Sequence, residues 1–237
     1  MSSDSPWGLN AVQRRSTTEQ VIAELRTAII TGRIGANEPL REASLAKVMG
    51  TGRSSVREAV RHLIGEGLVE HRPNRGAFVR SITEHEAFDV YLAREAIEVA
   101  AVRQAFERTT DLDLDGLESR LRRVILAAAS TPERLPAGTE LVTADLDFHR
   151  EMVALAGSPR LTRAHETLAA EAQMLMHHQP VYPLTDYAGD HRILFDAIAS
   201  RDPETDEKIR GHLRLSAQLI AGELHRMART RPIGEPV

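Results

Sequence analysis

The sequence has no cysteine, so disulfide bonds and thiolate metal sites are excluded. It also has no apolar run near the roughly 18 residues that a membrane-spanning helix needs. The first ten residues are polar and include Asp4, which argues against a secretory signal peptide. These three absences predict a cytoplasmic protein with no membrane partner.

The formal net charge is −4, and the charge is unevenly distributed along the chain. Residues 10–81 contain 12 Lys and Arg against 7 Asp and Glu, whereas residues 82–237 contain 18 against 26. A basic N-terminal segment is able to face phosphate groups, and an acidic remainder keeps the protein soluble and away from non-specific surfaces. The charge pattern therefore indicates two parts with different tasks.

The basic segment has the pattern of three helices followed by a two-stranded hairpin. Glycines between the second and third helices predict a tight turn, and Asn74 and Gly76 can adopt the positive φ that a hairpin turn needs. Ser55 and Glu58 have the spacing of a capping box at the start of the third helix. The predicted helices cover 18–31, 43–49 and 54–65, and the predicted strands cover 68–71 and 77–80.

A short helix, a glycine turn, a second helix and a hairpin, in that order, are typical of a winged helix-turn-helix. The second helix enters the DNA major groove, and the hairpin, or wing, reaches the adjacent minor groove or phosphates. The alternative is a small α/β domain with a solvated arginine face. The candidate DNA-contacting residues are Arg53, Ser54, Ser55, Arg57 and Arg61 on the helix, and Asn74, Arg75 and Gly76 on the wing.

The rest of the chain is helical in pattern, with short breaks that predict an antiparallel bundle. The expected fold class is therefore mainly α, with an N-terminal winged helix-turn-helix and a C-terminal all-α antiparallel helical bundle. We expect a DNA-binding domain at 10–81 and a domain for ligand binding, metal binding and dimerisation at 82–230. The bundle helices are predicted at 84–108, 112–129, 138–156, 160–178, 188–200 and 204–230.

Residues 40–79 contain the stretches LAKVMG (45–50), RSSVREAV (53–60) and NRGAFV (74–79). In this order they resemble the GntR family of bacterial transcriptional regulators. The resemblance implies that Arg53 and Arg57 touch DNA and that the wing glycine Gly76 lies close to it. Two positions depart from the family pattern: Gly52 stands where Ser or Thr is common, and Ser55 stands where Pro is frequent. The first departure removes a hydroxyl that could contact phosphate.

The second half carries a different signal, formed by one aspartate and three histidines. Asp145 and His149 are four residues apart in a predicted helix and project from one face, while His191 and His212 lie on the two following long helices. Side chains from three helices can converge inside a bundle, and imidazole with carboxylate suits Zn²⁺, Ni²⁺, Mn²⁺ or Fe²⁺. A surface hydrogen bond is the alternative for the Asp145–His149 pair. Two further histidines, His85 and His165, are predicted to be solvated.

Residues 91–98, 145–161, 190–198 and 209–213 look like the FCD ligand-binding domain of the FadR subfamily, an all-helical bundle. The resemblance implies that a divalent metal ion, Zn or Ni, is held by Asp145, His149, His191 and His212. The chain between His191 and His212 is one residue shorter than is common in that domain. If the missing residue falls in the turn near 203–206, His212 keeps its face; a loss within the helix would rotate it by roughly 100°.

Arg94 is the candidate effector-binding residue, in the pattern Arg-x-x-x-Glu. A pocket arginine can pair with an acidic effector. The spacing equally favours an internal salt bridge from Arg94 to Glu98. Both interpretations remain open from the sequence.

Together these features predict a transcriptional regulator that acts as a repressor and is not an enzyme. Its homodimer is expected to bind a pseudo-palindromic double-stranded operator, and a small carboxylate effector in the metal pocket is expected to shift the population of dimers that bind DNA. Two alternatives remain: a metal-dependent hydrolase that uses the Asp/His site, and a metal-free regulator. A hydrolase would need a general base beside the ion, and Asp147 projects from another helix face.

Overall fold

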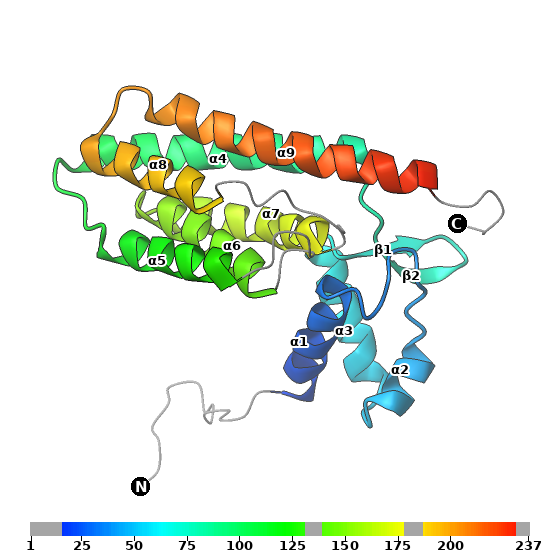
Figure 1. The fold of residues 1–237 in the computed structure, drawn as a ribbon. Helices are drawn as coiled ribbons and strands as arrows, with labels where there is room; N and C mark the ends of the chain where they lie inside the picture. Colours follow the sequence, from blue (N-terminus) through cyan, green and yellow to red (C-terminus); the bar gives the residue numbers. More distant parts are fainter. Residues whose placement is uncertain (1–15, 131–138, 178–186, 231–237) are drawn as a thin grey trace, which may run out of the picture.

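The computed structural model describes residues 16–130, 139–177 and 187–230 (Figure 1). A small N-terminal domain with one hairpin lies below a long helical bundle, which confirms the predicted mainly α class. Within the described ranges, no helix combines the length and the apolar character needed to cross a bilayer. The elements are α1 (Thr17–Ile30), α2 (Glu42–Val48), α3 (Arg53–Gly65), β1 (Val69–Arg72), β2 (Gly76–Val79), α4 (Glu84–Arg108), α5 (Asp115–Ser130), α6 (Thr139–Ala154), α7 (Pro159–His177), α8 (Tyr187–Ser200) and α9 (Thr205–Thr230).

The N-terminal domain is built around the packing of α1 against α3. A capping box begins α1: Ser16 accepts a hydrogen bond from the Glu19 amide, and the Glu19 carboxylate accepts one from the Ser16 amide. Gly32, at φ +72°, follows the end of α1 in the left-handed conformation that favours glycine. Burial of apolar side chains from both helices forms the core of this domain. These side chains include Val21, Leu25 and Ile29 of α1, and Val56, Val60 and Leu63 of α3.

Helix α3 begins at Arg53, one residue before its predicted start. Gly52 is its N-cap residue, and the cap makes no side-chain hydrogen bond. The predicted capping box of Ser55 and Glu58 is therefore wrong: the tight turn at Gly50, at φ +61°, starts the helix early enough that Ser55 already lies in the first turn. The N-terminal amide groups of α3 consequently have no side-chain cap.

The wing is an antiparallel hairpin of β1 and β2, in which Val69 pairs with Val79 and Arg72 with Gly76. Asn74 and Gly76 adopt positive φ, +61° and +93°, as the hairpin turn requires. Backbone hydrogen bonds between residues 37–40 and β2 hold the wing against the domain, for example from the Leu40 amide to the Ala77 carbonyl oxygen (2.8 Å).

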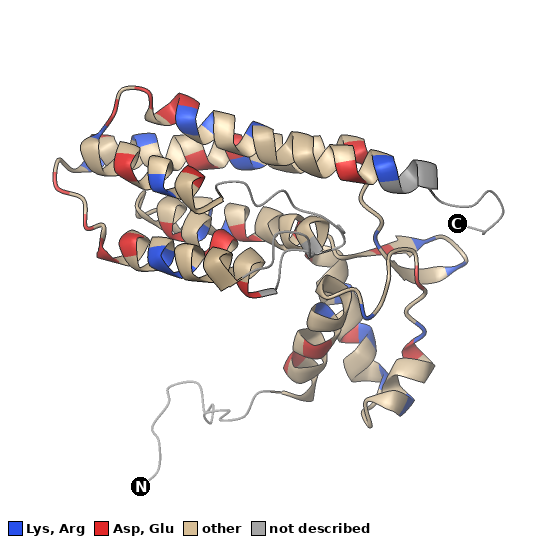
Figure 2. Ribbon diagram, in the orientation of Figure 1, with Lys and Arg blue, Asp and Glu red and all other residues tan. Residues whose placement is uncertain are grey.

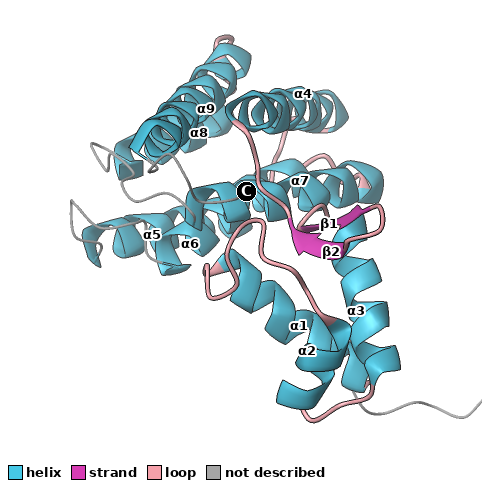
Figure 3. Ribbon diagram, turned by 90° about the vertical axis from the view of Figure 1, so that its right-hand side faces the viewer, coloured by secondary structure: helices cyan, strands magenta, loops and turns pink. Residues whose placement is uncertain are grey.

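The C-terminal domain is a bundle in which α4 packs against α6, α7 and α9 (Figures 1 and 3). Ion pairs show that α4 and α9 run antiparallel. Arg103 near the end of α4 pairs with Asp206 at the start of α9, and Arg214, further along α9, pairs with Glu95. Each predicted bundle helix is present, with its ends shifted by no more than a few residues.

One arginine joins the two domains. Arg80, in the linker after β2, donates to Glu171 of α7 (2.6 Å) and to Glu86 of α4 (2.7 Å). These bonds hold the pKa of Arg80 above its usual value although burial opposes the rise. Gly67, just before β1, also lies against α7, because a Cβ built on it would come within 3.0 Å of the Glu171 side chain. The N-terminal domain is thus fixed to the bundle mainly at α7.

Candidate DNA interface and metal centre

The predicted DNA-contacting residues lie on the outside of the N-terminal domain. Figure 2 shows cationic residues on α2, on α3 and at the tip of the wing. Ser55 is half-buried, whereas its neighbours on α3 and the residues of the wing tip are open to solvent. The exposed members of the predicted set are Arg53, Ser54, Arg57 and Arg61 of α3, and Asn74, Arg75 and Gly76 of the wing.

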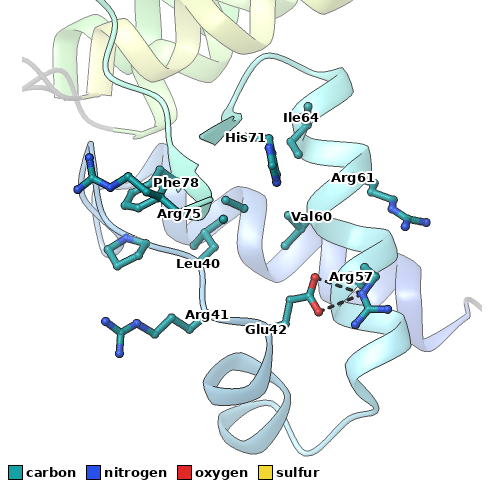
Figure 4. Close-up of a pocket in the computed structure, with 13 residues that line it drawn as sticks. Leu40, Arg41, Glu42, Arg57, Val60, Arg61, Ile64, His71, Arg75 and Phe78 are labelled. Atoms are coloured by element: carbon teal, nitrogen blue, oxygen red, sulfur yellow. Dashed lines mark hydrogen bonds and ion pairs between the residues drawn. The ribbon is translucent and has the colours of Figure 1, made fainter. Parts of the chain in front are cut away.

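A groove of about 830 Å³ lies between α3, residues 39–42 and the wing (Figure 4). Arg57 and Arg61 line its α3 side, and Arg75 and Gly76 line its wing side. Within the groove Arg57 Nε donates to the Glu42 carboxylate at 3.1 Å, which orients the guanidinium while leaving 55% of the side chain exposed. The groove is therefore open and has cationic side chains on both sides, one of which, Arg57, is oriented by Glu42.

One further arginine of this groove was not predicted from the sequence. Arg41 is exposed, is the N-cap residue of α2 and lines the groove opposite Arg57. Its position two residues before the predicted second helix was the available signal, because the start of a helix beside a recognition helix lies at the same surface.

The structure brings the aspartate and the three histidines of the predicted metal site together. One ligand atom from each of Asp145, His149, His191 and His212 lies within 4.8 Å of the others. α6 supplies the first two, α8 the third and α9 the fourth. His212 is half-buried and the other three are buried. His212 Nε2 lies 3.2 Å from His149 Nε2, so the shorter chain after His191 leaves His212 on the face that points into the cluster.

Two of the imidazoles are oriented by hydrogen bonds from their Nδ1 atoms. His149 Nδ1 donates to Glu98 Oε2 at 2.7 Å, and His191 Nδ1 donates to the Tyr187 carbonyl oxygen at 2.8 Å. The Tyr187 hydroxyl donates to Asp145. In the neutral tautomers set by these bonds, both Nε2 lone pairs point into the cluster. Such hydrogen bonds from the distal nitrogen are typical of metal-ligating histidines.

The burial of the cluster favours the protonation states that a metal site needs. Burial lowers the pKa of His149, and burial together with the neighbouring His191 and His149 lowers the pKa of His212 well below its usual value. Burial alone would raise the pKa of Asp145, but the interactions with His191, His149 and Arg94 hold that pKa well below its usual range. Neutral imidazoles and an ionised carboxylate are the forms that bind divalent metals.

The donor atoms also have the spacing that a bound cation requires. His191 Nε2 lies 3.0 Å from Asp145 Oδ1, and His149 Nε2 lies 3.2 Å from His212 Nε2. Metal–ligand bonds of about 2.0–2.2 Å place neighbouring ligand atoms roughly 3 Å apart. In the tautomers set by their Nδ1 bonds, His149 and His191 turn Nε2 lone pairs toward His212 and Asp145, and a cation held between these atoms would satisfy the lone pairs together with the carboxylate. The residues present therefore fit a divalent metal ion.

Beside this cluster lies a buried ionic network centred on Glu98. Its carboxylate accepts from Arg94 Nε (3.0 Å), from His165 Nε2 (3.1 Å) and from His149. Burial would raise the pKa of Glu98, but the interactions with His149, Arg94 and His165 keep that pKa well below its usual value. The sequence pointed to the Arg94–Glu98 pair, but not to the bond between Glu98 and His149.

The prediction for His165 is wrong and the prediction for His85 is confirmed. His85 is exposed on α4, whereas His165 is fully buried against Glu98. The available signal was helical spacing: His165 lies seven residues before Ala172 and eleven before Met176, both of which face the core. A histidine at such a position is buried with the apolar residues of that face.

The structure contains the internal salt bridge from Arg94 to Glu98 that was one of the two predictions for Arg94. Arg94 is 1% exposed and pairs with Glu98, and it also lies over the Tyr91 ring, 5.0 Å from its centroid. Arg94 Nη2 is buried and has no hydrogen-bond partner among the described residues. One donor of this guanidinium is consequently left over after the salt bridge has formed.

The fold and these two sites define a class of protein: a DNA-binding regulator that carries a helical ligand-sensing domain. "Bacterial regulatory proteins, gntR family" matches residues 17–79, and "FCD domain" matches residues 89–215. The chain belongs to the GntR family and has an FCD domain, a type that binds small-molecule effectors and commonly binds metals. It is a transcriptional regulator.

Individual relatives agree with this assignment over most of their length. The chain is 30% identical over 223 residues to the "Probable D-xylose utilization operon transcriptional repressor" of Paenarthrobacter nicotinovorans, covering 86% of this chain and 90% of that one. It is 28% identical over 192 residues to the repressor RspR of Escherichia coli K12, covering 80% and 82%. A solved GntR structure from Rhodococcus sp. RHA1 superposes with a TM-score of 0.73 at 27% identity, over 88% of this chain and 99% of that one.

Proposed function

We propose that the chain is a FadR-subfamily repressor that binds a pseudo-palindromic operator as a homodimer in the cytoplasm. In this proposal residues 10–81 bind DNA, and residues 82–230 bind metal and effector and form the dimer. The boundary between these two domains would lie in the linker between β2 and α4. The observation that supports it most is the row of exposed cationic side chains on α3 and the wing along one groove. Relatives named as repressors support repression of transcription rather than activation.

In the proposed complex α3 lies in the major groove and the wing follows the adjacent backbone. Arg53 and Arg57 are long donors near the start of α3, where they can reach base edges and phosphates. Ser54, Ser55 and the uncapped amides of α3 can donate to phosphate, since a helix N-terminus attracts anions. Arg61 lies one helical turn after Arg57, and we assign it to a contact with the DNA phosphate backbone. The wing contributes Asn74, Arg75 and Gly76.

The effector site of the proposal lies at the Asp/His cluster. Asp145, His149, His191 and His212 would hold Zn²⁺ or Ni²⁺, since imidazole and carboxylate donors suit both ions. When bound, the ion would offer remaining coordination positions to the carboxylate of a small organic acid. Arg94 supports this class of effector, because its unpaired Nη2 is a buried donor whose charge acts on Asp145. An effector carboxylate could accept from it.

The effector signal would reach DNA through α7. This helix contacts the Glu98 network through His165 and the linker through Glu171, which binds Arg80. A ligand that shifts α4 or α7 would therefore change the position of the DNA-binding domain. Only an effector that binds the two arrangements with different affinities can change the operator-bound fraction in this way.

The hydrolase alternative has less support than the regulator. Asp147 is drawn away from the cluster by Arg123, whose Nη1 donates to it at 2.8 Å. Glu98 is close to the cluster, but its carboxylate is engaged by Arg94, His149 and His165. Neither carboxylate is placed as a free general base. We therefore propose that the chain is not an enzyme.

Arg57→Ala tests the DNA-binding part of the proposal. The substitution is expected to weaken binding to duplexes that the wild-type protein selects from a random-sequence pool by about 1–3 kcal/mol, because it removes a base or phosphate contact of the recognition helix. The measurement is a fluorescence-anisotropy titration at fixed salt.

Arg33→Ala is the matched control. Arg33 lies in the same domain, has the same 55% exposed side chain and pairs with Glu24, but it does not line the groove. Its substitution is expected to leave the affinity within experimental error. Unchanged binding by Arg57→Ala, or an equal loss in both variants, would contradict the placement of α3 in the DNA.

A further inference from the structure

The outward face of α4 carries an apolar row that nothing in the described chain covers. Leu92 is 63% exposed and Phe88 is 42% exposed, and the exposed Ala96 and Ala100 continue the row at four-residue spacing. Residues spaced by four lie on one side of a helix. The other side of α4 is buried against α6, α7 and α9, so this row points away from the bundle.

A groove lies on this face of α4, and Leu92 is one of the residues that line it. It has a volume of about 430 Å³, and Ala96, Val99 and Ala100 form part of its lining together with Arg210 of α9. Ala96 and Ala100 have short side chains, so the surface of α4 is recessed at these positions. Leu92, one turn earlier, projects from that surface. A projecting side chain and a hollow on the same helix face are the two halves of a self-complementary contact, as a two-fold interface requires.

Two residues of opposite charge on this face, Asp89 and Arg103, are also placed symmetrically about Ala96. Asp89 lies seven residues before Ala96, and Arg103 lies seven residues after it. Seven residues are about two helical turns, so all three lie on the same side of α4. If two copies of α4 pack antiparallel with Ala96 at the centre, Asp89 of each copy faces Arg103 of the other. The same register places Leu92 opposite Ala100.

We propose that this face of α4 is the interface between two copies of the chain, packed antiparallel around Ala96. The inference deepens the proposed function, since a pseudo-palindromic operator needs two recognition helices related by a two-fold axis. Arg103 pairs with Asp206 within one chain, but its side chain remains 61% exposed and has donors left for Asp89 of the second copy. The DNA-binding domain lies on the other side of the bundle from α4 (Figures 1 and 3), so the pairing leaves the DNA groove open.

Leu92→Arg tests the apolar centre of this interface. The full-length wild-type chain is expected to sediment at twice the chain mass of 26.2 kDa, and Leu92→Arg at the mass of one chain. Leu126→Arg is the matched control, because Leu126 is 68% exposed but lies on α5. It is expected to remain dimeric, and circular dichroism checks that both variants are folded. A monomeric wild type, or a dimeric Leu92→Arg variant, would overturn the proposal.

A charge exchange tests the register. Asp89→Arg and Arg103→Asp each place like charges opposite each other, and each is expected to raise the dimer dissociation constant by at least about 10-fold. An equimolar mixture of the two variants restores both opposite-charge pairs in the heterodimer, and it is expected to dimerise more tightly than either variant alone. No gain on mixing would overturn the register. DNA binding, measured separately on the same samples, decides the proposed function independently of the mass.

Discussion

His191→Ala is expected to abolish the retention of Zn²⁺ or Ni²⁺ by the purified protein. His191 is fully buried, its Nε2 lies 3.0 Å from Asp145 Oδ1, and its ring is fixed by the Tyr187 carbonyl oxygen. Loss of a supporting hydrogen bond alone weakens metal sites by about 10–100-fold, so loss of a ligand should weaken binding by more than about 100-fold. Metal content after gel filtration, with the dissociation constant from competition with a chromophoric chelator, measures the effect.

The outcome also separates the alternatives for this site. About one equivalent of metal per chain, retained by wild type and by the exposed-histidine control His85→Ala but lost in His191→Ala, supports the metal-containing sensor. A wild type that binds no added Zn²⁺ or Ni²⁺ would favour the metal-free regulator. Metal-dependent turnover of organic-acid esters or amides would instead favour the hydrolase.

Glu98→Ala is expected to lower the free energy of unfolding of the metal-stripped protein by about 3–5 kcal/mol. The substitution removes the carboxylate that pairs with Arg94 and accepts from His149 and His165, all in a fully buried position. Arg94 would remain 1% exposed without its ion-pair partner. Urea denaturation followed by circular dichroism measures the change.

Glu95→Ala is the control on the same helix. Glu95 pairs with Arg214 and Arg210, whose side chains are 55% and 26% exposed and can be solvated when their partner is removed. The expected loss is at most about 1 kcal/mol, as for other solvent-accessible pairs. If Glu98→Ala and Glu95→Ala lower the stability equally, the Glu98 network contributes no more than a surface pair, and its assigned role in holding His149 is wrong.

The positions of the helices could be predicted because helical periodicity is a local property. The predicted helix 84–108 coincides with α4, since Thr83 and Glu86 form a cap at its start and the apolar repeat continues to Arg108. The strands were predicted within one residue of β1 and β2, because Asn74 and Gly76 mark the turn between them. The start of α3 was missed by one residue, since its N-cap is Gly52, which leaves no side-chain cap to recognise.

The sequence by itself determined the uneven charge, the order of the elements and the shared face of Asp145 and His149, because each of these depends on residues near one another in the chain. Only the tertiary structure decided that His191 and His212 meet this pair, that His165 is buried, and that Glu98 holds both His149 and Arg94. Distances between helices are set by the packing of whole faces and by the turns between them. A local pattern therefore predicts which side of a helix is buried, but not which side chains of other helices it meets there.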